Sequence, residues 1–165
     1  MSLWVIDSSP LIFLAKLNRL NLLRQEAEEV LVPPAVLEEI AEQDDEAKRQ
    51  IEEARRTWLE MRPVRNVRLL AVLKRELGDG EAEAITLAME TNAARIVLDD
   101  LDARRLADRL GLRLVGTLGL LLASKLRGEV PSLRAEIERL RSGGFRASPA
   151  LVEEILRSAG EEGQE

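Results

Sequence analysis

The chain has 165 residues, 45% of them hydrophobic and 33% charged, a balance that suits one globular domain of ordinary size. It contains no Cys and no His, which excludes disulfides, thiol nucleophiles, structural zinc sites and imidazole acid–base chemistry. A net charge of −6 argues against a protein that coats nucleic acid through phosphate contacts alone, and two Trp and two Phe are too few for base stacking on an aromatic platform.

The beginning of the chain shows no charged-then-apolar leader, so we expect no signal peptide. The longest apolar run, residues 118–123, is far too short to span a bilayer. We therefore expect a cytoplasmic protein that makes no membrane contact.

Short apolar runs alternate with stretches of helical periodicity along the chain. The runs predict strands at residues 3–6, 30–32, 64–67, 95–98 and 112–115. The periodic stretches predict helices at residues 11–22, 35–61, 69–77, 80–92, 101–110, 118–126, 131–140 and 149–159. This alternation indicates an α/β fold with a mostly parallel sheet.

Capping and breaking residues mark several of the expected boundaries. Ser8 or Ser9 is expected to cap the first helix, and Asp79 the helix at 80–92. The charged stretch 42–46 is either a solvated helix face or a bend between two helices. We expect a domain core at residues 1–128, two further helices at 129–160 packed on the same domain, and a disordered tail at 161–165.

Half of the eight Asp residues lie at the ends of two predicted strands: Asp7 after the first, and Asp99, Asp100 and Asp102 after the fourth. Ligands of parallel α/β sheets bind beyond the carboxyl ends of the strands. The alternative is that each Asp caps the next helix, which fits Asp7 least, because two serines and a proline already follow it. A carboxylate at the end of an apolar strand costs desolvation unless it is paired or binds a cation, so a shared metal is indicated.

Two Glu residues could join these Asp residues. Glu81 precedes Ala84 and Ile85 by three and four residues, which places it on a stripe that faces the sheet, although acids are also favoured at any helix N-terminus. Glu83 lies two residues after Glu81, so it is expected to point to nearly the opposite side of the helix. Glu39 has a similar spacing after two apolar residues, although it could be an ordinary solvated Glu.

Several acids at one sheet edge would suit metal-assisted hydrolysis of a phosphodiester. Carboxylate oxygens suit hard cations such as Mg²⁺ or Mn²⁺. A bound ion lowers the pKa of its water molecule and so generates the nucleophile, which means that no His is needed as a base. Thr117, at the end of the fifth strand, could orient a phosphate or a water, although a helix N-cap is its simpler interpretation.

Five segments in this order resemble the PIN-domain family, and together they cover roughly residues 1–128. They are residues 5–12, 32–40, 80–88, 96–100 with 103–104, and 116–119. Each is weak alone, but five in order are fairly specific. Residues 144–146 and their flanking helices look like a stand-alone prokaryotic branch of the family.

The resemblance implies a three-layer α/β/α sandwich of strand order 3-2-1-4-5 and Mg²⁺- or Mn²⁺-dependent cleavage of RNA. Many members are VapC-type toxins neutralised by a small antitoxin, and homodimers are common. By motif match, the catalytic acids are Asp7, Glu39, Glu81 and Asp100. The same acids would bind the metal, with Asp99 as the near alternative to the last; secondary candidates are Asp102, Glu83, Ser9 and Thr117.

The chain departs from the family pattern at two places: Glu81 stands where many relatives carry Asp, and Leu98 where many carry Thr or Ser. A non-catalytic PIN-like module that binds RNA or a protein is therefore the alternative. A phosphatase of the haloacid-dehalogenase type would need an Asp where Ser9 stands. Arginines near the acidic edge could contact RNA, although some of them could instead pair with acids on the helix surface: Arg95, Arg104, Arg105 and Arg109.

Overall fold

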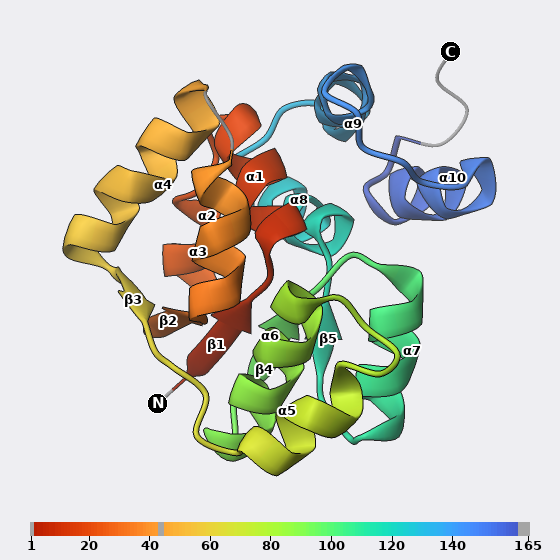
Figure 1. The fold of residues 1–165 in the computed structure, drawn as a ribbon. Coiled ribbons are helices and arrows are strands. Elements are labelled where there is room, and N and C mark those ends of the chain that lie inside the picture. Colours follow the sequence, from red (N-terminus) through yellow and green to blue (C-terminus); the bar gives the residue numbers. More distant parts are fainter. Residues whose placement is uncertain (1, 43–44, 162–165) are drawn as a thin grey trace.

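The computed structural model describes residues 2–42 and 45–161. This part of the chain contains a five-stranded parallel sheet of order β3-β2-β1-β4-β5 (Figure 1). The strands are β1 Leu3–Ile6, β2 Glu29–Val32, β3 Leu59–Met61, β4 Arg95–Val97 and β5 Leu114–Val115. The α/β class and the strand order are therefore as predicted.

The central strands are buried on both faces, which explains their continuous apolar sequences. Along β1, Val5 packs into one hydrophobic core, whereas Trp4 and Ile6 pack into the other. In β4, Ile96 and Val97 divide between the two cores in the same way. Each alternation follows from the two-residue period of a strand.

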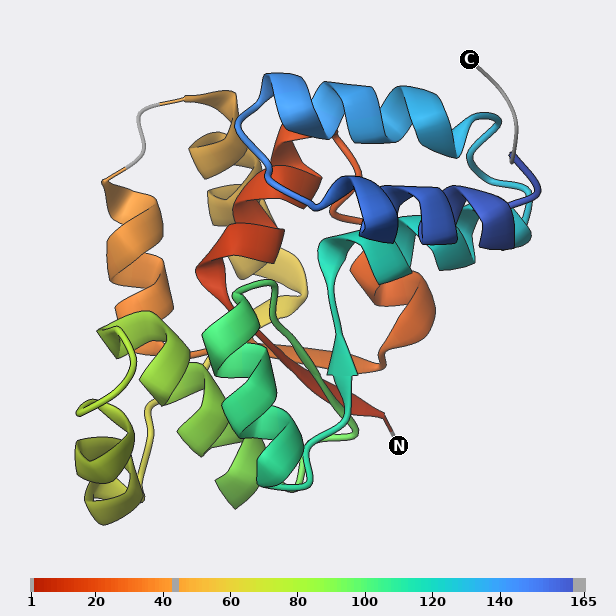
Figure 2. The ribbon, with the colours of Figure 1, turned by 90° about the vertical axis from the view of Figure 1, so that its right-hand side faces the viewer.

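Helices cover both faces of the sheet (Figures 1 and 2). One core is completed by α1 Ser8–Lys16, α2 Leu22–Glu26, α3 Pro34–Ala41, α4 Glu46–Thr57, α8 Thr117–Leu126, α9 Leu133–Ser142 and α10 Pro149–Ser158. The other core is completed by α5 Val67–Leu73, α6 Asp79–Glu90 and α7 Leu101–Arg109. The result is the three-layer α/β/α sandwich with the sheet in the middle.

The third strand was predicted in the wrong place. It lies at β3, where Leu59 pairs with Val30 of β2 and is 1% exposed, and not at residues 64–67. Pro63 lacks the N–H that a sheet ladder needs, and Val67 already begins α5. A single helix over 35–61 is also wrong, and the alternative of two helices holds, because α3 and α4 are separate and the second is capped by Asp45. Residues 43 and 44 of the charged stretch lie outside the described residues.

Helix α1 is shorter than predicted and begins differently. It ends at Lys16, and Asn18 beyond it adopts a positive φ of 59°, which breaks the helix before residue 22. Asp7 stands at its N-cap position, with Ser8 and Ser9 inside the first turn. Similarly, α6 starts at Asp79 with Gly78 as its N-cap.

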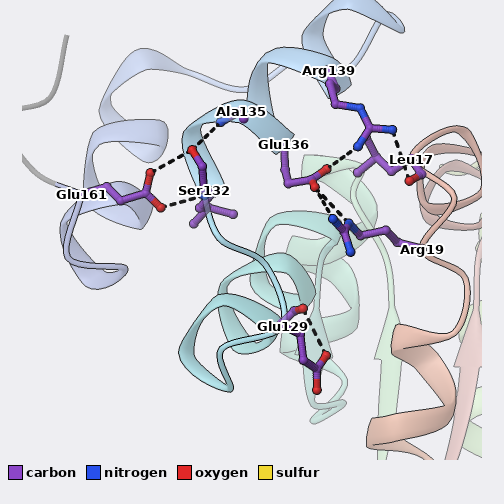
Figure 3. A network of polar contacts seen from close by, with 10 residues as sticks. Leu17, Arg19, Glu129, Ser132, Ala135, Glu136, Arg139 and Glu161 are labelled. Carbon is purple, nitrogen blue, oxygen red and sulfur yellow. Dashed lines mark hydrogen bonds and ion pairs between the residues drawn. The ribbon is translucent and has the colours of Figure 1, made fainter.

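The C-terminal helices α9 and α10 pack beside α8 (Figure 2) and are tied to the first helix. The Phe13 and Phe145 rings meet edge-on, 5.1 Å between centroids, and the Lys16 ammonium donates to the Gly143 carbonyl at 3.2 Å. Arg19, just beyond α1, pairs with the buried Glu136 of α9 (Figure 3).

Glu161, which was predicted to belong to a disordered tail, has a defined place in the fold. Glu161 is buried, and its carboxylate accepts hydrogen bonds from the Leu133 and Arg134 N–H groups at the start of α9. These donors would otherwise be unsatisfied, which explains why the residue is ordered. Residues 162–165 lie outside the described residues. Among the helices of the described segments, none is long and apolar enough to cross a membrane.

Candidate active site

The acids gather where β1 and β4 end. These neighbouring strands pair Ile6 with Val97, and the Asp7 N–H donates to the Val97 carbonyl at 3.0 Å. Asp7 therefore lies beside the residues that follow β4. The Ser9 hydroxyl spans the two strand ends, because it donates to Oδ2 of Asp99 at 3.3 Å.

In the described part of the chain, the buried carboxylate of Asp7 forms no ion pair. Its side chain makes no cap bond, the residue is 3% exposed, and Oδ1 has no hydrogen-bond partner among the described residues. Burial raises the pKa of Asp7 to about 7; the Ser8 N–H works against this shift, and the negative charges of Glu81, Glu39 and Asp99 add to it. The capping interpretation therefore does not account for Asp7.

Glu81 faces the same acids from the first turn of α6. Burial raises its pKa to about 7, and the charge of Asp100, the charge of Glu39 and a hydrogen bond with Asp100 add to the shift. The proximity of these acids therefore keeps Glu81 protonated to a higher pH than an exposed Glu.

Glu39 reaches the acids from α3. Its Oε2 accepts a hydrogen bond from the Ser8 hydroxyl at 2.6 Å, and its Oε1 lies against Gly80 so closely that a Cβ there would collide with it. A side chain at Gly80 would therefore displace the Glu39 carboxylate from its present position. Glu39 is exposed as a residue, yet its carboxylate is held on the site side of α3.

Asp99 is fixed by hydroxyl and backbone donors. Thr117 donates its N–H to Oδ1 at 2.8 Å and its hydroxyl to Oδ2 at 2.6 Å. Thr117 is fully buried and is the first residue of α8, and Gly116 is the N-cap, so the capping interpretation of Thr117 is wrong. A Cβ at Gly116 would meet the Asp99 carboxylate at 3.0 Å, so this glycine also makes room for the site.

Asp100 and Asp102 lie on the outer side of the group. Asp100 caps α7, because its Oδ2 accepts from the Ala103 N–H at 3.0 Å, and it also faces Glu81. The capping alternative thus holds for Asp100, and the same residue lies close to Glu81. Asp102 is largely exposed, faces Arg105 at 3.9 Å and acts on Glu81 only through its charge.

Of the four arginines predicted to contact RNA, two lie near the acids and two lie away from them. Arg104 donates to the Leu98 carbonyl at 2.6 Å, which holds its guanidinium beside the acids. Arg105 pairs with Asp102 on the same face of α7. Arg95 begins β4, and Arg109 ends α7, so both lie at the ends of their elements away from the acids. Their predicted placement near Asp99 and Asp100 was wrong, because each element carries its acids at its other end.

The oxygen donors of this edge suit a hard divalent cation. The unpartnered Oδ1 of Asp7 is available to a cation, and burial, to which the charges of the neighbouring acids add, raises the pKa values of Asp7 and Glu81. Within the described part of the chain, however, no three acidic side chains form a group already arranged around an ion. The acids that could supply oxygens are Asp7, Glu39, Glu81, Asp99 and Asp100.

One contributor to the site was missed in the sequence, because Ser8 was expected only as a cap, yet it holds Glu39. Glu83, a secondary candidate, accepts a hydrogen bond from the Ala35 N–H at 3.1 Å. Neither contact has a local signal, since they link residues 31 and 48 positions apart.

A parallel sheet of order 3-2-1-4-5, with carboxylates gathered at the carboxyl ends of its central strands, defines an α/β protein with an acidic site. A family model described as a PIN domain matches residues 3–161, and the chain therefore belongs to the PIN-domain family. PIN domains are in general nucleases, which makes a hydrolase of nucleic acid the broad class of this protein. No curated protein matches the chain.

Proposed function

We propose that this protein is a metal-dependent endoribonuclease that hydrolyses RNA phosphodiester bonds with Mg²⁺ or Mn²⁺. The observation that supports this proposal best is Asp7, which is 3% exposed, has one unpartnered oxygen among the described residues and is surrounded by acids. A buried carboxylate in a purely structural role is normally paired, because an unpaired buried charge is destabilising. A divalent cation would provide the missing partner.

The cation would be held by oxygens of Asp7, Glu39, Glu81, Asp99 and Asp100. When bound, such an ion lowers the pKa of a water molecule and stabilises charge on the leaving oxygen. The chain's own residues prepare the ligands: Ser8 holds Glu39, and Thr117 with Ser9 holds Asp99. Loading the site requires Glu81, whose pKa is raised to about 7, to lose its proton and the side chains to close together.

Arg104 and Arg105 are the residues that we propose for phosphate contacts. Arg104 Nη1 is anchored on the Leu98 carbonyl, which leaves its other N–H groups available for a phosphate near the acids. Arg105 is largely exposed, and an exposed ion pair such as the one with Asp102 exchanges readily for a phosphate. On the family resemblance, we extend the proposal to a cytoplasmic homodimer that acts as a toxin with a small antitoxin partner.

A non-catalytic PIN-like module that binds RNA or a protein is the second candidate. It is favoured by the acids standing apart, with no three of them arranged around an ion within the described segments. The net charge of −6 also favours it over a basic RNA-binding nuclease.

The test is cleavage of a panel of single-stranded and structured RNAs with and without Mn²⁺. Wild type is compared with Asp7→Asn and with Glu60→Gln, which changes an exposed acid on β3 that pairs with Arg62. We expect cleavage that needs Mn²⁺, is lost in Asp7→Asn and is kept in Glu60→Gln. Absence of cleavage by folded wild type, together with RNA binding that ignores Mn²⁺, would favour the non-catalytic module.

A further inference from the structure

Glu83 makes a hydrogen bond between the two helices that carry Glu39 and Glu81. It lies on α6, two residues after Glu81, and its Oε1 accepts from the Ala35 N–H of α3 at 3.1 Å. The side chain is half-buried, and this hydrogen bond directs its carboxylate to the start of α3.

The start of α3 needs such an acceptor. The helix begins with Pro33 as N-cap and Pro34 as its first residue, and Pro33 provides no side-chain cap. Proline has no N–H, so Ala35 carries the first donor of the helix. A carboxylate at this end also interacts favourably with the helix dipole. Glu83 thus caps α3 from a neighbouring helix.

The same pair of helices makes a second contact one turn away. Glu39 lies four residues after Ala35, on the same face of α3, and its carboxylate packs against Gly80 of α6. Gly80 in turn lies three residues before Glu83. Ala35 with Glu83 and Glu39 with Gly80 are therefore two adjacent points at which α3 is fastened to α6.

The second point brings like charges together, because Glu39 acts on the neighbouring Glu81 as a repelling charge. The Glu83 hydrogen bond holds the helices together where this repulsion would separate them. We propose that Glu83 is a positioning residue, which seats α3 on α6 and so sets the separation of Glu39 and Glu81 and the affinity of the acidic edge for a divalent cation. The part that concerns the cation rests on the proposed function.

The first experiment measures Mn²⁺ affinity by calorimetry and the melting temperature for wild type, Glu83→Ala and Glu83→Gln. Glu90→Ala is the matched control, because Glu90 lies on the same helix and also accepts a backbone N–H, that of Arg65 at 2.9 Å, far from the acids. We expect Glu83→Ala to weaken Mn²⁺ binding about tenfold, as loss of an outer partner of a metal ligand does. Glu83→Gln keeps an oxygen acceptor and should restore most of the affinity, whereas Glu90→Ala should lower only the melting temperature.

A loss caused by charge alone would appear equally in Glu83→Ala and Glu83→Gln, and that result would overturn the proposal. So would a Glu83→Ala variant that binds Mn²⁺ as Glu90→Ala does.

A double-mutant cycle without metal decides the positioning role even if wild type does not bind Mn²⁺, which would count against the proposed function only. Melting temperatures are measured in chelator at pH 8 for Glu81→Gln in the wild-type and Glu83→Ala backgrounds. Relief of repulsion should raise the melting temperature less in the Glu83→Ala background, by about 2 °C, because α3 is no longer held against α6. Equal rises in the two backgrounds would contradict the proposal.

Discussion

Asp7 and Glu136 are both buried carboxylates, 3% and 5% exposed, and they have opposite surroundings. Glu136 accepts hydrogen bonds from Arg19 and Arg139, which fasten α9 to the end of α1 (Figure 3). Asp7 has an oxygen without a partner in the described part of the chain and is surrounded by other acids. The same chain thus satisfies a buried acid where it only joins helices and leaves one unsatisfied at the edge of the sheet, which indicates a role outside packing.

Glu161 resembles Glu136 in this respect. The N–H groups of Leu133 and Arg134 donate to its carboxylate, and the Lys125 ammonium lies 3.5 Å away. Burial acts to raise the pKa of Glu161, but these donors and the cation outweigh burial and hold the pKa below its usual value. The buried acids Glu136 and Glu161 therefore both have donors and cations as partners, unlike Asp7 at the acidic edge.

The largest effect on stability is expected at Glu136. Glu136→Gln leaves Arg19 and Arg139 without their carboxylate and should lower the free energy of unfolding by about 3 kcal/mol, measured by urea denaturation. The control is Glu46→Gln, whose exposed pair with Arg49 should be worth about 0.5 kcal/mol or less. Equal losses in the two variants would show that the pairing at Glu136 contributes nothing special.

Replacing the Asp7 carboxylate with an amide is expected to raise the free energy of unfolding, whereas the same replacement at Glu136 lowers it. Asp7→Asn removes a charge that is buried and repelled by its neighbours, so the free energy of unfolding should rise by about 2 kcal/mol at pH 8 in chelator. Urea denaturation in parallel with Glu136→Gln measures it. A clear loss of stability would mean that Asp7 is paired in solution and would remove the contrast between the two regions.

The stabilising effect of Asp7→Asn on the free energy of unfolding should depend on pH. The pKa of Asp7 in the folded protein, about 7, lies above its ordinary value of 3.8, so ionisation destabilises the fold. The stability contributed by the protonated group is complete near pH 4 and is lost as the pH rises to about 7. The difference between Asp7→Asn and wild type should therefore be largest above pH 7 and shrink toward pH 4, in unfolding curves recorded at each pH. A difference that does not change with pH would contradict the raised pKa.

The smallest effect is expected at Thr117. Thr117→Val removes the hydroxyl that donates to Asp99 and should lower kcat/KM for RNA cleavage about fivefold, the value of one hydrogen bond. Thr91→Val is the matched control, because the Thr91 hydroxyl donates to the Leu87 carbonyl at the far end of α6. Cleavage rates that fall equally in the two variants would argue against a role of Thr117 in holding Asp99.

Strands and site residues whose positions depend on neighbouring residues in the chain could be predicted from the sequence. The apolar run 3–6 became β1 because a strand buried on both faces is apolar throughout, and Asp7 could be placed at the carboxyl edge from that alone. In β3, by contrast, only Leu59 is buried, and the strand exists because it pairs with β2. No periodicity within residues 59–67 reveals that pairing.

The same limit applies to the site. Asp7, Asp99, Asp100 and Glu81 could be proposed from strand ends and helical spacing, and the structure brings them together. The contacts that hold Glu39 in place, from Ser8 and at Gly80, depend on how α3 meets α1 and α6. Such contacts between distant segments have no signature in a single sequence.

The most direct test of the account is calorimetric titration of Mn²⁺ into wild type and Asp7→Asn at pH 7, in two buffers with different ionisation enthalpies. Because the pKa values of Asp7 and Glu81 are both about 7, the free site is partly protonated at this pH. We expect Mn²⁺ to bind wild type with release of about one proton and to bind Asp7→Asn far more weakly. Absence of Mn²⁺ binding by folded wild type, or equal binding by Asp7→Asn, would contradict the assignment of the acidic edge as a metal site.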